Sequence, residues 1–469
     1  MEKIWDLERY NNNLAIIDEF ENQLSYYDLY AISNELANKV GNRCLVFSLC
    51  RNEIGSLLGY VSFINNGIVP VLLNSHLEID LLCNLVETYK PSFLWVPIDQ
   101  KELFSKTTEV YEIYNYVLLK TCFDCFPMYD KLALLLTTSG STGSPKLVRQ
   151  SYENVLENAR SIVEYLKLNE DERPITTLPM NYTYGLSIIN SHLLVGATIL
   201  VTDRGLMQKE FWEFFKQQKA TSFGGVPYTY EMLDKLRFYR MELPSLHTMT
   251  QAGGKIIPEL HAKFAKYAKE NNKQFIVMYG QCEATARMGY LPAEKAIEKV
   301  GSMGIAIPNG KFYLLGNDGI VIKDPFVTGE LIYEGKNVTL GYAECAEDLQ
   351  KGDERKGILE TGDMAQFDDD GYFYIVGRKK RFLKVYGNRV NLDEVDRLIK
   401  EEYGIEVACS GVDDHIYIFI TDSKYSDRVR NFIINKTRLN PAAFKVIVIS
   451  DIPKNDSGKI LYKELVKYY

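Results

Sequence analysis

One segment of the chain combines small hydroxyl residues, glycines and a lysine, and it follows an apolar stretch. It runs Thr137-Thr138-Ser139-Gly140-Ser141-Thr142-Gly143-Ser144-Pro145-Lys146, directly after the mostly apolar residues 131–136. Small residues let backbone N–H groups crowd around phosphate oxygens, and hydroxyls add further donors. The spacing is not that of a Walker loop, and a flexible linker would need neither the apolar strand nor the lysine. The segment therefore predicts a phosphate-binding loop.

Five further segments stand out along the chain. In chain order they are LPMNYTYGLS (178–187), YGQCEAT (279–285), GELIYEGKNVTLGY (329–342), ETGDMAQFDDDGYFYIVGR (360–378) and PKNDSGKI (453–460). Glu283 offers a carboxylate for a magnesium ion carried by a triphosphate. Tyr279 offers a flat face for a base, and Asp363 and Arg378 can bond ribose hydroxyls.

Taken together and in this order, the segments resemble the motifs of the adenylate-forming superfamily, which holds acyl-CoA synthetases, adenylation domains of nonribosomal peptide synthetases and beetle luciferases. The resemblance extends over nearly the whole chain. It implies an AMP-dependent ligase that activates a carboxylic acid to acyl-AMP, releases pyrophosphate, and transfers the acyl group to a phosphopantetheine thiol. The implied cofactors are ATP, Mg²⁺ and CoA or phosphopantetheine.

The resemblance also implies the roles of individual residues. Catalytic roles fall on Lys459, Glu283 and Lys146, with Glu283 also as the metal ligand. Lys459 would neutralise charge as the carboxylate attacks phosphorus. The implied nucleotide-binding residues are Thr138, Ser139, Gly140, Ser141, Thr142, Gly143, Gly253, Gly254, Tyr279, Gly280, Cys282, Asp363 and Arg378.

Two positions depart from the family's usual pattern. Cys282 stands where the family usually has Thr, and a thiol donates a weaker hydrogen bond than a hydroxyl. Lys380 stands at the hinge position, which often carries Asp. The five histidines offer no convincing catalytic base, and the reaction needs none because the attacking carboxylate is already ionised.

The acid pocket is expected around the substrate loop. Its candidate residues are Tyr182, Tyr184, Gly185, Phe223, Gly224 and Met288. Tyrosines and a methionine favour a partly apolar acid with one polar group, and the lack of a carboxylate in the loop disfavours an α-amino acid.

The acceptor stays open between CoA and a carrier protein that acts in trans. Gly387 matches a family glycine on the pantetheine route, and both acceptors present the same pantetheine arm. Two other functions also stay open, a luciferase-like oxygenase that acts on an acyl-adenylate and a non-catalytic adenylate-binding paralogue.

The elements that must position these residues follow from hydrophobic pattern. Apolar runs alternate with segments of helical periodicity in the first 130 residues and in the middle of the chain, which favours parallel sheets covered by helices, whereas antiparallel strands are expected from about Gly329. Ser25 is expected to cap a helix, and Asp368–Gly371 to turn between antiparallel strands. Together with the resemblance, this pattern implies an α/β fold with a large domain at 1–378, made of βαβ-type sheets, helices and a small β-barrel-like part, and a small mobile α+β domain at 379–469.

Composition bounds the remaining possibilities. The 469 residues are too many for a single core, and the net charge of −8 argues against nucleic acid as a partner. No signal-like start or membrane-length apolar run is present, so we expect a cytoplasmic enzyme. We expect the eight cysteines, Cys122 and Cys125 included, to be unpaired core thiols.

Overall fold

The computed structural model describes residues 3–137, 146–386, 388–437, 439–454 and 460–469. These residues divide into two compact units. The first comprises residues 1–311 and 333–359, and the second comprises 312–332 and 360–469. The predicted domain boundary at 378/379 stays a prediction.

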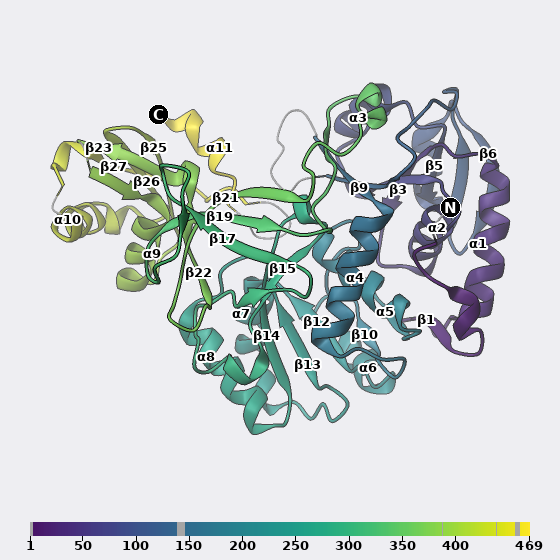
Figure 1. Ribbon diagram of the computed structural model, residues 1–469, viewed down its shortest axis with the longest axis horizontal. Helices are drawn as coiled ribbons and strands as arrows, with labels where there is room; N and C mark the ends of the chain where they lie inside the picture. Colours follow the sequence, from purple (N-terminus) through teal and green to yellow (C-terminus); the bar gives the residue numbers. More distant parts are fainter. Residues whose placement is uncertain (1–2, 138–145, 387, 438, 455–459) are drawn as a thin grey trace. The chain divides into compact units, whose positions relative to one another are not determined.

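The first unit contains a nine-stranded sheet and an eight-stranded sheet (Figure 1). The nine-stranded sheet has the order β16 (Ile305–Ala306), β15 (Arg287–Tyr290), β14 (Gln274–Gly280), β13 (Thr248–Gln251), β12 (Ser222–Gly225), β10 (Pro174–Ile175), β11 (Ile199–Val201), β1 (Leu14–Asp18) and β2 (Gln23–Ser25). Strands β10 to β14 pair in parallel, as the alternating pattern predicts.

The eight-stranded sheet has the order β20 (Gly341–Ala343), β9 (Leu147–Ser151), β8 (Leu132–Thr137), β4 (Val69–Asn74), β3 (Leu45–Cys50), β5 (Phe93–Pro97), β7 (Tyr116–Lys120) and β6 (Thr108–Ile113). Its centre is parallel, whereas β9 and β20 add antiparallel strands at one edge. That edge carries the end of the phosphate-loop segment.

Helices cover and join the two sheets. They are α1 (Tyr26–Val40), α2 (Ile54–Asn65), α3 (Ile79–Tyr89), α4 (Tyr152–Leu166), α5 (Thr183–Leu194), α6 (Lys209–Gln217), α7 (Pro227–Lys235) and α8 (Pro258–Glu270). One buried apolar cluster includes Leu57 of α2, Leu134 of β8, Val155 of α4, Leu186 of α5 and Ile199 of β11. Because α4 and α5 also pack along each other, this core holds the substrate-loop helix rigidly between the sheets (Figure 1).

The second unit contains three smaller sheets. The first has the order β18 (Val321–Ile322), β17 (Lys311–Leu315), β19 (Gly329–Glu334), β21 (Ile358–Phe367) and β22 (Phe373–Arg378). The second pairs β23 (Phe382–Val385) with β24 (Asn388–Asn391), and the third joins β25 (Val407–Val412), β26 (His415–Ile420) and β27 (Phe444–Val448). Its helices are α9 (Leu392–Tyr403), α10 (Ser426–Thr437) and α11 (Tyr462–Leu465). This mixture of sheets and helices agrees with the predicted α/β class.

Local signals read from the sequence match the structure closely. The Ser25 hydroxyl accepts a hydrogen bond from the Asp28 amide, and the Asp28 side chain accepts one from the Ser25 amide, so the first long helix starts in a capping box. The predicted turn closes with a hydrogen bond from the Gly371 amide to the Asp368 carbonyl at 2.9 Å.

The cysteine prediction is correct in one respect and wrong in another. All eight thiols are free, but Cys83, Cys122 and Cys125 are exposed rather than in the core. Cys122 and Cys125 follow the strand β7 in a segment without regular structure.

Candidate active site

Lys146 directly precedes the strand β9, which follows the phosphate-loop segment. Strands β8 and β9 are antiparallel neighbours, with Thr137 opposite Leu147, so the two ends of the segment lie side by side. The Lys146 Nζ lies 2.5 Å from Glu344 Oε1 and 5.9 Å from the centre of the Tyr342 ring. The loop residues predicted to hold phosphate, 138–143, lie outside the described residues.

Glu283 sits in a 3-10 turn, η4 (Cys282–Ala284), at the end of β14. Its backbone carbonyl accepts hydrogen bonds from the Thr339 amide at 3.0 Å, from the Thr339 hydroxyl at 2.9 Å and from Arg355 Nη1 at 3.1 Å. Its carboxylate Oε1 accepts a hydrogen bond from the Tyr342 hydroxyl at 2.7 Å. The structure thus brings two predicted catalytic residues, Lys146 and Glu283, around one tyrosine.

Sequence reasoning singled out neither Tyr342 nor Arg355. The Arg355 guanidinium lies 4.6 Å from the centre of the Tyr342 ring, a distance typical of a cation–π contact. Burial, and then the negative charge of Glu283, raise the pKa of Tyr342, so its hydroxyl stays protonated and can donate. The available signal was the Gly-Tyr that ends residues 329–342, a segment recognised only as a family landmark.

Two glycines predicted to lie near the nucleotide occupy positions where a larger residue would clash with a neighbouring atom. A Cβ on Gly280 would lie 1.7 Å from the Ala286 carbonyl oxygen, which no larger residue could accommodate. Gly253 has a φ of +82°, and a Cβ there would lie 2.5 Å from the Tyr182 hydroxyl. The base-side Tyr279 is partly buried, and its hydroxyl accepts a hydrogen bond from Gln281 Nε2 at 3.1 Å.

Cys282 lies near Tyr182, one of the residues predicted to line the acid pocket. Burial raises the pKa of Tyr182 to about 12, with a smaller contribution from the nearby Cys282 thiol. The Tyr182 hydroxyl is therefore neutral at physiological pH. Tyr182 therefore connects the nucleotide-side residues Gly253 and Cys282 with the substrate loop.

The predicted pocket residues fall into two groups. The Tyr184 hydroxyl lies 2.7 Å from Thr250 Oγ1, and a Cβ on Gly224 would lie 2.8 Å from the same hydroxyl. Tyr182, Tyr184 and Gly224 thus come together. The Phe223 ring packs instead among Phe215, Tyr230 and Phe238, and Met288 is fully buried. Whether these residues contact an acid stays a prediction.

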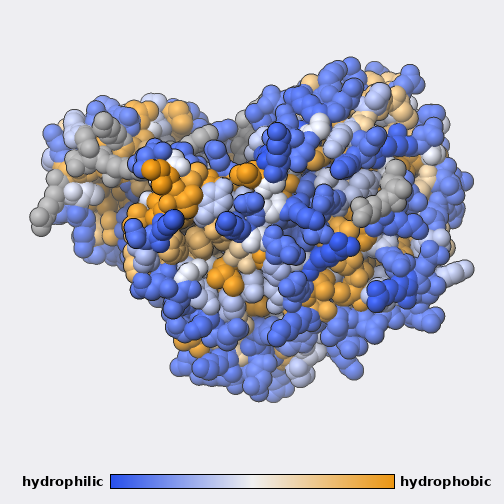
Figure 2. All heavy atoms as spheres, viewed as in Figure 1, coloured by the Kyte–Doolittle hydropathy of each residue, from blue (hydrophilic) through white to orange (hydrophobic). Residues whose placement is uncertain are grey.

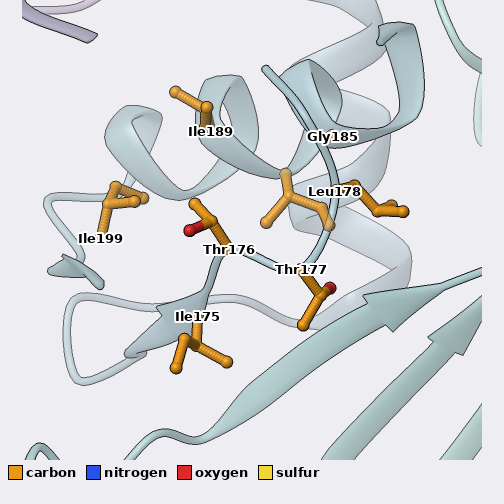
Figure 3. Close-up of a pocket in the computed structure, with 8 residues that line it drawn as sticks. Ile175, Thr176, Thr177, Leu178, Gly185, Ile189 and Ile199 are labelled. Atoms are coloured by element: carbon orange, nitrogen blue, oxygen red, sulfur yellow. The ribbon is translucent and has the colours of Figure 1, made fainter. Parts of the chain in front are cut away.

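Gly185 lines a small pocket where the strand β10 approaches the helix α5 (Figure 3). The hydroxyl of Thr176 donates to the Thr202 carbonyl, and that of Thr177 donates to the Gly224 carbonyl. The remaining lining is apolar and comprises Ile175, Leu178, Ile188, Ile189 and Ile199. The threonine hydroxyls are engaged with the backbone, so this pocket offers a mainly hydrocarbon wall.

Asp363 and Arg378 come together in the second unit. They are opposite residues of the antiparallel pair β21–β22, with Arg378 Nε 3.4 Å from Asp363 Oδ1. Asp363 is buried within a strand and Arg378 is exposed. Arg378 therefore forms an ion pair with the other predicted ribose ligand, Asp363.

Lys380 lies in the 3-10 turn η7 (Lys379–Arg381) that follows β22. Its two neighbours are anchored, since Lys379 pairs with Glu330 at 2.6 Å and Arg381 pairs with Asp393 and Asp396. Gly387 and Lys459, predicted for the pantetheine route and for adenylation, lie outside the described residues.

The described residues contain no cluster of three or more His, Cys, Asp or Glu side chains that could hold a metal ion. A single carboxylate, Glu283, fits a magnesium ion that takes its other ligands from phosphate and water oxygens. The same part of the chain has no helix that is long and apolar enough to cross a membrane.

Comparison with known proteins decides the family. The model of the AMP-binding enzyme family matches residues 5–343. This chain belongs to the AMP-binding enzyme family. The predicted superfamily is thereby confirmed, and with it the general class of ATP-dependent, AMP-forming ligases.

Similar curated proteins are CoA ligases. The chain is 27% identical to oxalate–CoA ligase of Arabidopsis thaliana over 362 residues, which cover 72% of this chain and 68% of that enzyme. It is 23% identical to 2-succinylbenzoate–CoA ligase of Bacillus subtilis strain 168 over 469 residues, which cover 96% and 94%. Alignments with three plant and yeast CoA ligases span 63–68% of those enzymes. The predicted class of acid–thiol ligase agrees with these relatives.

The fold has close counterparts among solved structures. The O-succinylbenzoate coenzyme A synthetase of Bacillus subtilis, solved with AMP, superposes with a TM-score of 0.80 at 22% identity, covering 99% of this chain and 98% of that one. The predicted α/β fold, with a large N-terminal part and a smaller C-terminal part, is confirmed.

Proposed function

We propose that this family member joins a carboxylic acid to AMP, releases pyrophosphate, and then transfers the acyl group to the thiol of CoA. The observation that supports the proposal most directly is the meeting of Lys146 and Glu283 at Tyr342, beside the end of the phosphate-loop segment. A cation and a carboxylate held together there suit a triphosphate that carries a divalent ion.

In the first half-reaction, a carboxylate oxygen attacks the α-phosphorus of ATP, and the bond from that phosphorus to the bridging oxygen of pyrophosphate breaks. Mg²⁺ neutralises phosphate charge when it is bound with the nucleotide. Glu283 would hold that ion, Tyr342 would fix the orientation of Glu283, and Lys146 would balance charge on the departing pyrophosphate. Lys459 would stabilise the charge that develops at the α-phosphate.

In the second half-reaction, a thiolate attacks the acyl carbonyl carbon, a thioester bond forms, and AMP leaves with the bonding electron pair. The names of the relatives favour CoA as the acceptor. A phosphopantetheine on a carrier protein would present the same thiol, so it remains the second acceptor for testing.

The decisive experiment is ATP–pyrophosphate exchange with the purified full-length protein and a library of carboxylic acids. At least one acid should support exchange, and Glu283→Gln should lower it about 10²-fold because a charge-stabilising group is lost. Glu294→Gln, which removes an exposed carboxylate from the same part of the chain, is the matched control. Product analysis with CoA and with carrier proteins then identifies the acceptor.

Two results would point to the other functions. Light emission or oxygen uptake with an acyl-adenylate would indicate a luciferase-like oxygenase. ATP or acyl-AMP binding without exchange by any acid would indicate a non-catalytic paralogue.

A further inference from the structure

Arg287 is a buried arginine at the start of β15, only 2% exposed. Its backbone carbonyl accepts hydrogen bonds from Asn158 Nδ2 at 2.8 Å and from Asn337 Nδ2 at 3.1 Å. Two amides from distant parts of the chain thus hold the residue in place, so the position of its side chain is set by the fold.

The guanidinium has only neutral hydrogen-bond partners in the part of the chain that the structure describes. Nε donates to Ser187 Oγ at 3.0 Å, and Nη1 donates to the Tyr165 hydroxyl at 2.9 Å. An arginine has five N–H donors, so donors on Nη1 and Nη2 are left over. No described Asp or Glu side chain forms an ion pair with this guanidinium within 4.0 Å.

The two titratable side chains beside the guanidinium, Tyr165 and His192, carry no negative charge. Burial raises the pKa of Tyr165, and the positive charge of Arg287 offsets this only in part. Burial lowers the pKa of the neighbouring His192 to about 3, so this imidazole is neutral at physiological pH. The guanidinium is therefore a buried positive charge without a counter-ion among the described groups, an arrangement that is strongly unfavourable.

A second buried arginine, Arg149, has a carboxylate partner that balances its positive charge. Arg149 is fully buried, but it pairs with the Glu354 carboxylate and donates to the carbonyls of Tyr342 and Gly352. Other charged residues lie mostly at the surface, where hydrophilic atoms cover much of the face in Figure 2. Arg287 differs because no Asp or Glu side chain among the described residues pairs with its guanidinium.

The predicted acid pocket lies directly beside this guanidinium. The Arg287 guanidinium carbon is 5.4 Å from the centre of the Tyr184 ring, and its partner Ser187 lies on the same helix, α5, as Tyr184. Tyr184 also contacts Gly224 and Thr250, which brings the arginine to the wall formed by the candidate pocket residues.

We propose that Arg287 binds a second carboxylate of the substrate, so that the acid activated by this enzyme is a dicarboxylic acid. The proposal rests on the proposed function and specifies its substrate class. One carboxylate of the acid reacts with the α-phosphate, and the other stays unreacted as the counter-ion of Arg287. The tyrosines beside it contact the hydrocarbon between the two carboxylates.

The test uses pairs of acids that differ only at the end away from the reacting carboxylate, where one has a methyl group and the other a carboxylate. Suitable pairs are butanoate with succinate, pentanoate with glutarate, and 2-methylbenzoate with phthalate. Exchange is measured for wild type, Arg287→Gln, Arg287→Lys and the control Arg160→Gln, which removes an exposed arginine from α4.

Wild type should favour the best diacid over its matched monoacid by about 30-fold or more in kcat/KM, because truncating one partner of a buried charge pair costs at least that much. Arg287→Gln should lose this preference while its activity with monoacids changes less than about 3-fold. Arg287→Lys should keep part of the preference, and Arg160→Gln should behave as wild type. A wild-type preference for monoacids, or an equal loss for both acids in Arg287→Gln, would overturn the proposal.

Thermal unfolding separates this proposal from the proposed function. If no acid supports exchange, the proposed function fails, and millimolar diacids are compared with their monoacids for the shift in Tm. A larger diacid shift in wild type that disappears in Arg287→Gln and persists in Arg160→Gln supports the carboxylate site on its own. Equal shifts for diacids and monoacids would show that Arg287 binds no carboxylate.

Discussion

The hydroxyl of Tyr342 donates a hydrogen bond to Oε1 of Glu283 at 2.7 Å, although the two residues lie on different segments of the first unit. Two cations lie near the same tyrosine ring, with Lys146 Nζ 5.9 Å and the Arg355 guanidinium 4.6 Å from its centre. Tyr342 therefore controls the direction of the carboxylate that is proposed to hold the metal.

Removing this hydroxyl tests its positioning role. Tyr342→Phe keeps the ring for Arg355 and deletes the hydrogen bond to a charged group, which is worth about 1.5–3 kcal/mol. The Mg²⁺ concentration that gives half-maximal exchange should rise roughly 10-fold or more, with little change at saturating Mg²⁺. The measurement is a magnesium titration of exchange.

Tyr27→Phe is the matched control, because Tyr27 is an exposed tyrosine on α1. It should leave the magnesium titration unchanged. If Tyr342→Phe lowers exchange equally at every Mg²⁺ concentration, the tyrosine does not act through the metal carboxylate.

Lys459 is expected to serve adenylation and not thioester formation. Lys459→Ala should lower acyl-AMP formation about 10²-fold or more, since transition-state charge stabilisation is lost. Thioester formation from supplied acyl-AMP should survive. Both half-reactions are measured separately, and an equal loss in both would contradict the assignment.

Cys282 is expected to stand in for the threonine that the family usually has. Cys282→Thr should keep or improve ATP affinity, because a hydroxyl donates a stronger hydrogen bond than a thiol. The KM for ATP in the exchange assay is the measurement. Loss of exchange in this variant would mean that the thiol has another role, one consistent with its position beside Tyr182.

Lys380 is the expected hinge between the half-reactions. Lys380→Pro restricts φ and removes an N–H, and the flanking ion pairs of Lys379 and Arg381 leave little freedom to either side. One half-reaction should therefore fall far more than the other. Lys424→Pro, at the middle of the 3-10 turn η8 (Ser423–Tyr425), is the control and should slow neither. Wild-type rates of both half-reactions in Lys380→Pro would show that the hinge lies elsewhere.

The burial of His192 makes stability depend on pH. Burial lowers the pKa of His192 to about 3, while the unfolded chain titrates near 6.5. Below pH 6.5 the imidazole of His192 is protonated in the unfolded state but stays neutral in the folded state. The free energy of unfolding therefore falls as pH decreases, by up to about 1.4 kcal/mol per pH unit.

Denaturant unfolding between pH 7.5 and 5.5 measures this dependence. His192→Gln should flatten it, whereas His415→Gln, which changes an exposed histidine, should not. An unchanged slope in His192→Gln would mean that other groups cause the acid sensitivity.

Local chemistry explains which parts could be predicted. The Ser25 capping box and the Asp368–Gly371 turn depend on neighbours within a few residues, and the strands show as apolar runs between helical segments, so these patterns are visible in the chain. The exposed Cys122 and Cys125 could not be predicted, because exposure depends on what packs over a segment rather than on its residue type.

The sequence by itself determined the family, the α/β class, and the phosphate-loop, Glu283 and Asp363 motifs, because these are contiguous signals of residue type and spacing. Only the tertiary structure decided that Tyr342 holds Glu283 and that Arg287 lies buried against Tyr184 without a carboxylate among the described residues. Both relations join segments that meet only through sheet pairing and helix packing. The partner of a single tyrosine or arginine cannot be predicted from its local sequence, because long-range packing determines which residues it contacts.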